Sequence, residues 1–132
     1  LTRDSGIKLR VAALLSLGND RESLSERIAI AKRAGEPSEI REAALRSLLH
    51  DNKFIDVAMT IVADETEGSA IRAAAVAAIG LNALYNGSKL TTQQLREVRS
   101  RLIAVDPIQR DLGSAIKKAL LRIDRALSDT SS

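Results

Sequence analysis

Apolar residues recur along this chain with the periodicity of a helix rather than that of a strand. In the segment IREAALRSLL, residues 40–49, the aliphatic positions lie three or four residues apart and therefore share one helix face. Only two prolines interrupt the 132 residues, which leaves long stretches of helix-forming residues. The pattern predicts an all-α chain, with helices over about residues 5–17, 23–34, 38–50, 53–64, 69–86, 91–105 and 107–127.

Local signals mark several of the expected helix ends. Ser23 is followed three residues later by Glu26, and Thr91 in the same way by Gln94. Each pair predicts a capping box, in which the two side chains bond the free backbone N–H groups at a helix start. Gly18 follows a periodic segment, where glycine commonly ends a helix.

The helical pattern returns at a fixed interval. The segments LRVAALLSLG, IREAALRSLL and IRAAAVAAIG begin 31 residues apart at Leu9, Ile40 and Ile71, and IKKALLRI begins 45 residues later at Ile116. A different apolar helix is expected between successive copies, so the repeating unit is a helix pair. One such pair cannot bury its apolar face alone, and the repeat therefore predicts stacked pairs.

The four copies share their columns. The basic column is Arg10, Arg41, Arg72 and Lys117, and the alanine column is Ala12, Ala43, Ala74 and Ala119. A further aliphatic column is Leu14, Leu45, Val76 and Leu121. Small alanine side chains predict a close approach between neighbouring helices. The extra residues before the fourth copy are expected to lengthen the fifth helix and the loop after it.

These segments resemble HEAT-like repeats, in particular the short bacterial type related to the PBS-lyase HEAT-like repeats. The resemblance covers nearly the whole chain. It implies an armadillo-like, right-handed α-solenoid of about seven helices in three to four helical hairpins, with residues 1–128 as one domain and 129–132 as a frayed tail. Because the chain begins with Leu1 rather than Met, we expect it to be a fragment of a longer protein.

The resemblance also suggests a role for the basic column. In HEAT repeats, an acidic residue just before the second helix commonly pairs with a basic residue at its start. Here Glu36 and Glu67 lie five residues before Arg41 and Arg72. We therefore expect a ladder of ion pairs between acids and the basic column across the repeats.

The composition argues against catalysis. The chain has no cysteine and one histidine, His50, so a transition-metal site rich in nitrogen or sulfur is not expected. The repeated His-Glu pairs of HEAT-like di-iron hydroxylases are absent from the sequence, and one Phe and one Tyr offer little surface for gripping a nucleobase. We expect no enzyme activity, no metal and no cofactor. No apolar run reaches the ~18–20 residues of a membrane span, and we expect a cytoplasmic location.

The net charge of +3 arises in the last third of the chain. Residues 1–90 hold 12 basic and 12 acidic residues, whereas residues 91–132 hold 8 and 5. The basic patch is Arg96, Arg99, Arg101, Arg110, Lys117 and Arg125. It is either a solvated surface with local pairs such as Glu97 to Arg101, or a docking patch for nucleic acid, an acidic protein or membrane headgroups.

The repeat architecture predicts a non-enzymatic scaffold that binds a protein or peptide partner, acidic at least in part, on the face of the second helices. The candidate contact residues are Val11, Leu15, Glu42, Arg46, Ala73, Ala77, Lys118 and Arg122. The alternative is a nucleic-acid-binding module that uses the basic C-terminal third. The sequence leaves the partner and the oligomeric state open.

Overall fold

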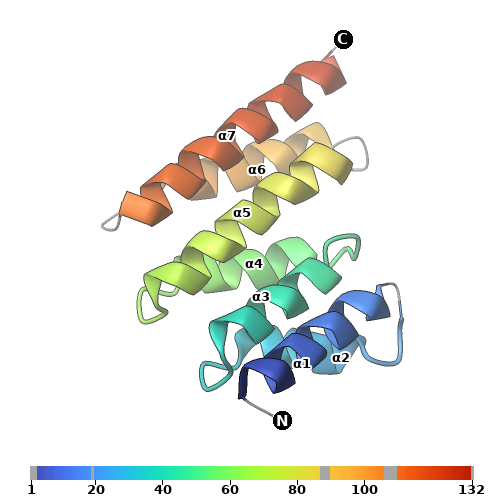
Figure 1. The fold of residues 1–132 in the computed structure, drawn as a ribbon. Helices are drawn as coiled ribbons and strands as arrows, with labels where there is room; N and C mark the ends of the chain where they lie inside the picture. The colour runs from blue at the N-terminus through green and yellow to red at the C-terminus, as the bar shows by residue number, and fades with distance from the viewer. Residues whose placement is uncertain (1–2, 19, 87–89, 106–109, 132) are drawn as a thin grey trace.

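A computed structural model describes residues 3–18, 20–86, 90–105 and 110–131 (Figure 1). Within these ranges every regular element is an α-helix, and the all-helical prediction is confirmed. The seven helices are α1 (Arg3–Leu17), α2 (Leu24–Lys32), α3 (Ser38–Ser47), α4 (Phe54–Ala63), α5 (Ser69–Asn86), α6 (Thr92–Ile103) and α7 (Arg110–Ser131).

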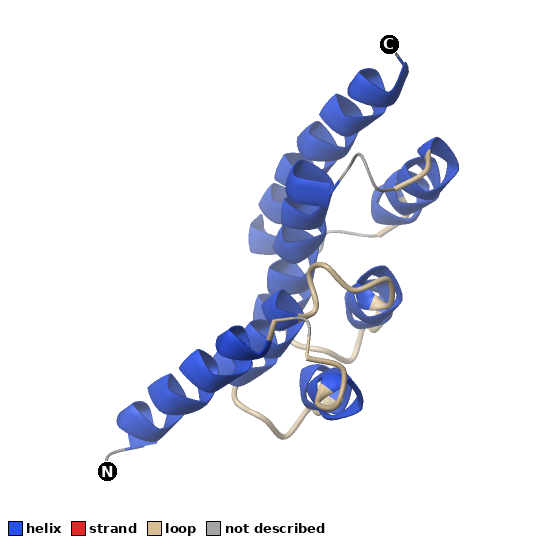
Figure 2. Ribbon diagram, turned by 90° about the vertical axis from the view of Figure 1, so that its right-hand side faces the viewer, coloured by secondary structure: helices blue, strands red, loops and turns tan. Residues whose placement is uncertain are grey.

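The helices form two layers (Figure 2). The front layer consists of α1, α3, α5 and α7, which contact one another in that order. The back layer consists of α2, α4 and α6, and each of these packs on the front helix that follows it in the chain. The front helices carry the four copies of the repeat, so each copy has its nearest front-layer neighbours in the copies before and after it.

The C-terminal ends of α3 and α7 differ most from the sequence prediction. Helix α3 ends at Ser47, before the predicted residue 50, because the side chain of Arg27 binds the Ser47 carbonyl oxygen at 2.9 Å and satisfies the last turn. Helix α7 continues to Ser131, so residues 129–131, predicted to belong to a frayed tail, are helical. Ala126 and Leu127 pack against the core and hold α7 in place up to its last turn.

One predicted capping box is confirmed and the other is wrong. The Thr91 hydroxyl accepts the Gln94 backbone N–H at 3.0 Å, and the Gln94 side chain accepts the Thr91 N–H at 2.9 Å. Ser23 instead has helical backbone angles, and its hydroxyl accepts a bond from Arg27 Nε at 2.9 Å. Gly18 has φ of +48° at the end of α1, as expected for a glycine that stops a helix.

The largest fully buried side chain is a charged one that the sequence patterns do not single out. Arg27 is 2% exposed and donates to three carbonyl oxygens, those of Gly18, Asp20 and Ser47, at 2.6–2.9 Å. It also donates to the hydroxyls of Ser23 and Ser47. Arg27 therefore joins the end of α1, the turn that follows it and the end of α3.

The expected ladder of ion pairs is present between different partners from those that the spacing suggested. Glu36 pairs with Arg10 at 2.5 Å, and Glu67 pairs with Arg41. In both cases the acid belongs to the following repeat and lies 26 residues after its arginine. The ladder consequently links neighbouring copies rather than joining residues within one copy.

Two arginines of the basic column also cap back-layer helices. Arg41 Nε donates to the carbonyl oxygen of Ala31 at 3.0 Å, and Arg72 Nε donates to that of Val62 at 2.9 Å. Those carbonyls lie in the last turns of α2 and α4, where no intrahelical N–H is available for the final four oxygens. The repeated arginine is thus a structural residue of the helix pair.

The fourth copy is packed one residue out of the register that its sequence suggests. Leu121, the predicted equivalent of Val76, is 72% exposed. Ile71 and Ile116 are both buried at the predicted spacing of 45, but farther along the helices the buried Ala75 and Ile79 are matched by Ala119 and Ile123 at a spacing of 44.

Helices α5 and α7 approach each other closely, as the alanine column predicts, but the close contact is at Gly80 and Ala119 rather than at Ala74. Ala74 is half-buried at the edge of a hollow between α5 and α7, and Ala12 is exposed on α1. The tightest contact lies at Gly80, where a Cβ atom would stand 3.2 Å from the Cα of Ala119. Glycine here allows the backbones of α5 and α7 to come together.

In the loop after α4, hydrogen bonds from Thr66 lower the pKa of Asp64, and this effect can be tested by substitution. The hydroxyl of Thr66 donates to Asp64 Oδ1 at 2.5 Å and its backbone N–H donates at 2.9 Å, and these bonds hold the pKa of Asp64 below its ordinary value of 3.8. Thr66→Val should raise the pKa of Asp64 in a carboxyl NMR titration. Asp20 is the control, because its pKa is lowered by Ser23 and should not change.

The direction of the linked stability effect follows from the lowered pKa. A carboxyl whose folded pKa is depressed adds stability that is present above the unfolded pKa and is lost as the pH falls through the folded pKa. Thr66→Val should therefore reduce the difference in stability between neutral pH and pH values below 3.8. A larger difference in the variant would contradict this assignment.

Candidate functional site

The eight candidate contact residues lie on the exposed side of the front layer, in two groups of four. Val11 and Leu15 of α1 face Glu42 and Arg46 of α3 across a hollow of about 200 Å³, here called the α1/α3 hollow. Its wall is apolar on the α1 side. On the α3 side, Arg46 and Glu42 form an ion pair at 3.2 Å, so their charges offset each other.

The second group lines a larger hollow between α5 and α7, here called the α5/α7 hollow, with a volume of about 500 Å³. Ala73 and Ala77 contribute from α5, and Lys118 and Arg122 contribute from α7. The α5 side consists of small residues, so the backbone of that helix is accessible. Asp111 is the acidic residue of the lining, which leaves one net positive charge there.

The predicted basic patch is distributed over several surfaces. Arg99 pairs with Asp124 at 2.7 Å, and Arg101 faces a groove on the back layer. Arg96, Lys117 and Arg125 are exposed, and the side chain of Arg110 lies outside the described residues. The expected ion pair between Glu97 and Arg101 is not among the ion pairs of the described residues.

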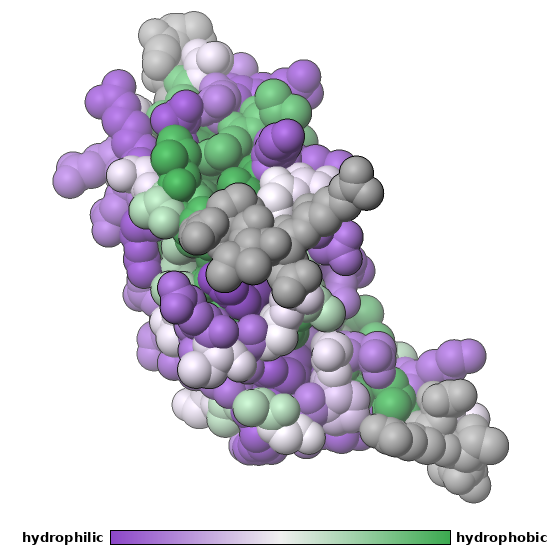
Figure 3. All heavy atoms as spheres, turned by 90° about the vertical axis from the view of Figure 1, so that its left-hand side faces the viewer, coloured by the Kyte–Doolittle hydropathy of each residue, from purple (hydrophilic) through white to green (hydrophobic). Residues whose placement is uncertain are grey.

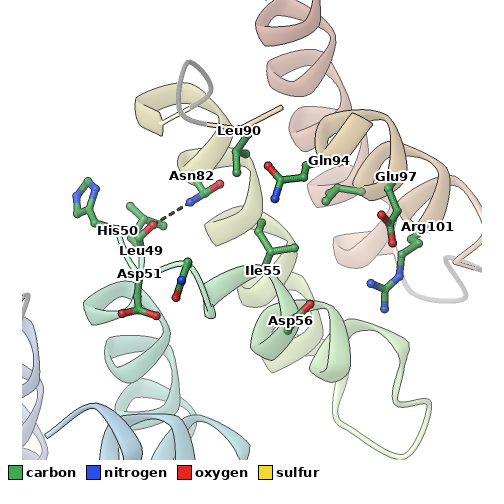
Figure 4. A pocket seen from close by; sticks show the side chains of 12 residues that line it. Leu49, His50, Asp51, Ile55, Asp56, Asn82, Leu90, Gln94, Glu97 and Arg101 are labelled. Atoms are coloured by element: carbon green, nitrogen blue, oxygen red, sulfur yellow. Dashed lines mark hydrogen bonds between the residues drawn. The ribbon is translucent and has the colours of Figure 1, made fainter. Parts of the chain in front are cut away.

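A groove that the sequence patterns did not predict opens in the back layer (Figure 4). It has a volume of about 380 Å³ and is here called the α4/α6 groove. Its lining comes from the turn between α3 and α4, from α4 and α5, and from α6 with the residue Leu90 before it. His50 belongs to this turn, but its exposed side chain points away from the groove.

The sequence feature that accompanies the groove is the larger spacing before the fourth copy of the repeat, 45 residues instead of 31. The expected lengthening of the fifth helix is confirmed, since α5 has 18 residues and α3 has 10. Helices α2 and α4 pack against each other, whereas α4 and α6 make no comparable contact. The expected lengthening of the following loop is wrong, because residues 87–91 between α5 and α6 are one fewer than residues 48–53 between α3 and α4. The longer α5 therefore separates two back-layer helices and leaves the groove between them.

Large hydrophobic side chains are also exposed outside the hollows and the groove, among them Ile103 and Leu121. Figure 3 shows apolar side chains gathered on the part of one side where α6 and α7 lie, with hydrophilic side chains around them. Among the described residues, no helix is long and apolar enough to cross a membrane. The same part of the chain holds no group of three or more His, Cys, Asp or Glu residues placed to bind a metal ion.

Comparisons of the chain with protein-family models, with curated proteins and with solved structures give no significant match. The repeat, the two front-layer hollows and the α4/α6 groove are the features of the chain that bear on its function.

Proposed function

We propose that the chain is a HEAT-like, right-handed α-solenoid that serves as a non-enzymatic scaffold for a protein or peptide partner. The 31-residue repeat, the ladder of ion pairs between copies and the ordered contacts of the front layer support this architecture. Each helix pair buries its apolar face against its neighbours, which is the arrangement that repeat proteins use to build extended surfaces.

One observation carries the proposal. The eight candidate residues, taken from all four copies, line two hollows on the same exposed layer. Four helices at ~8–10 Å spacing give a surface long enough for a standard interface of about 800 Å² per partner.

The two hollows favour different parts of one ligand. The α1/α3 hollow offers Val11 and Leu15 to apolar side chains. The α5/α7 hollow offers Lys118 and Arg122 to carboxylates, with small residues that let a partner backbone approach. An amphipathic peptide with an acidic segment complements both hollows.

The distribution of the basic residues favours this partner over a nucleic acid. Arg99 is engaged by Asp124, Arg101 faces the back layer, and Lys118 faces the front layer. A duplex needs cations along one surface that follows its phosphates.

The proposal is tested with peptides selected from a display library against the full chain. The double variant Lys118→Glu and Arg122→Glu should lower the association rate of the selected peptides by about tenfold at low salt, because those charges steer the encounter. The readout is surface plasmon resonance at two salt concentrations.

The matched control is Lys117→Glu with Arg96→Glu, which changes the net charge equally at exposed positions outside the hollows. It should have a small effect on the association rate. Equal losses in both double variants would contradict a local contact. Tight, salt-dependent binding of duplex DNA without any selected peptide would favour the nucleic-acid alternative.

A further inference from the structure

A buried amide oxygen in the middle of α5 lacks a hydrogen bond. Asn82 is 5% exposed, and its Nδ2 donates to the carbonyl oxygen of Leu49 at 2.8 Å. Its Oδ1 has no partner, and it is the one buried side-chain N or O atom among the described residues in this state. Buried polar atoms are nearly always paired, so an unpaired one requires an explanation.

The orientation of the Asn82 amide follows from its one hydrogen bond. Because the Leu49 carbonyl accepts from Nδ2, the oxygen is the atom on the other side, toward Leu90 and Gln94 (Figure 4). The oxygen thus points to the side of the α4/α6 groove. It has almost no accessible surface of its own, so a ligand atom reaches it only after a neighbouring side chain is displaced.

The lining of the groove combines apolar walls with carboxylates. The apolar residues are Leu49, Ile55, Leu90 and Val98. Asp51 is paired with Arg21 at 3.3 Å, whereas Asp56 and Glu97 are exposed and form no ion pair with another described residue. Set against the positive charge of Arg101, these two carboxylates leave one net negative charge in the groove.

We propose that the α4/α6 groove binds the side chain of a lysine from a partner peptide. The aliphatic stem packs on the apolar walls, and the ammonium group donates to Asn82 Oδ1 and to the carboxylates of Asp56 and Glu97. An unpaired amide oxygen needs a donor, and the carboxylates favour a cation over a neutral donor. A single recessed oxygen suits a compact ammonium better than the planar fork of an arginine.

This site is separate from the proposed scaffold surface. It lies in the back layer, whereas the α1/α3 and α5/α7 hollows lie in the front layer. Either proposal can therefore fail while the other stands.

The direct test is an NMR titration of the full chain with blocked lysine, Nα-acetyl-lysine methylamide. We expect a dissociation constant on the order of millimolar, because a single side chain offers few contacts. The side-chain amide signal of Asn82 should shift together with backbone signals of α6. Nα-acetyl-norleucine methylamide has the same stem without the ammonium group and should bind at least about tenfold more weakly.

Substitutions at the carboxylates test the charge contribution without removing a buried group. Glu97→Gln and Asp56→Asn should each weaken lysine binding by roughly twofold to fivefold, as expected for exposed charge pairs. The control is Glu65→Gln, the same charge change at an exposed position of the α4–α5 loop, which should leave binding unchanged. Equal binding of norleucine, or unchanged binding by both groove variants, would overturn the proposal.

Discussion

Replacing Arg27 by methionine should lower the free energy of unfolding by roughly 3–5 kcal/mol, because backbone carbonyl oxygens would lose their donor at a cost of about 1–3 kcal/mol for each one left unsatisfied. Methionine preserves much of the side-chain volume but donates no hydrogen bond. The carbonyl oxygens of Gly18, Asp20 and Ser47 would each lose a partner. The hydrogen bonds that join the end of α1 to the end of α3 through Arg27 would therefore be lost.

Urea unfolding followed by circular dichroism measures this loss as a shift in midpoint at an unchanged slope. Arg21→Met is the matched control, because the Arg21 side chain is 79% exposed and makes one ion pair, with Asp51. A surface pair of this kind contributes about 0–1 kcal/mol. Comparable losses in the two variants would show that burial of Arg27 contributes nothing.

Glu67→Ala should cost about 3 kcal/mol, because it leaves the guanidinium of Arg41 buried without its counter-ion. The side chains of Arg41 and Glu67 are 5% and 11% exposed. Arg41 would keep its bond to the Ala31 carbonyl oxygen, so its charge could not move readily into solvent.

The chain contains its own control for this experiment one repeat earlier. Glu36 pairs with Arg10 in the same register, but Arg10 is 49% exposed and its charge is solvated. Glu36→Ala should therefore cost no more than about 1 kcal/mol. If both variants lost the same stability in urea unfolding, the position in the repeat rather than burial would determine the energy of the pair.

The sequence by itself determined the helices and their number. A period of three to four apolar residues depends on the geometry of a single helix, so it can be read without knowing the neighbours. The capping box at Thr91 and the glycine stop at Gly18 are local in the same sense, and both are confirmed. The grouping of the candidate contact residues by face also follows from the helix period, because it places Val11 with Leu15 and Lys118 with Arg122 on single faces.

Local signals failed where another residue competed for the same group. Ser23 has the sequence of a capping box, but Arg27 takes its hydroxyl. Glu36 lies five residues before Arg41, but it pairs with Arg10 because neighbouring copies lie side by side. In both cases the side chain bonds the group that lies nearest in the folded structure, which the local sequence pattern does not indicate.

Only the tertiary structure decided how the last repeat joins the others. The close contact between Gly80 and Ala119 sets α7 against α5, and beyond Ile116 the buried Ile123 matches Ile79 at a spacing of 44 rather than 45. The length of α5 then separates α4 from α6 and opens the groove beside Asn82. Helix packing depends on which side chains meet across two backbones, and the period of one helix contains no information about that crossing.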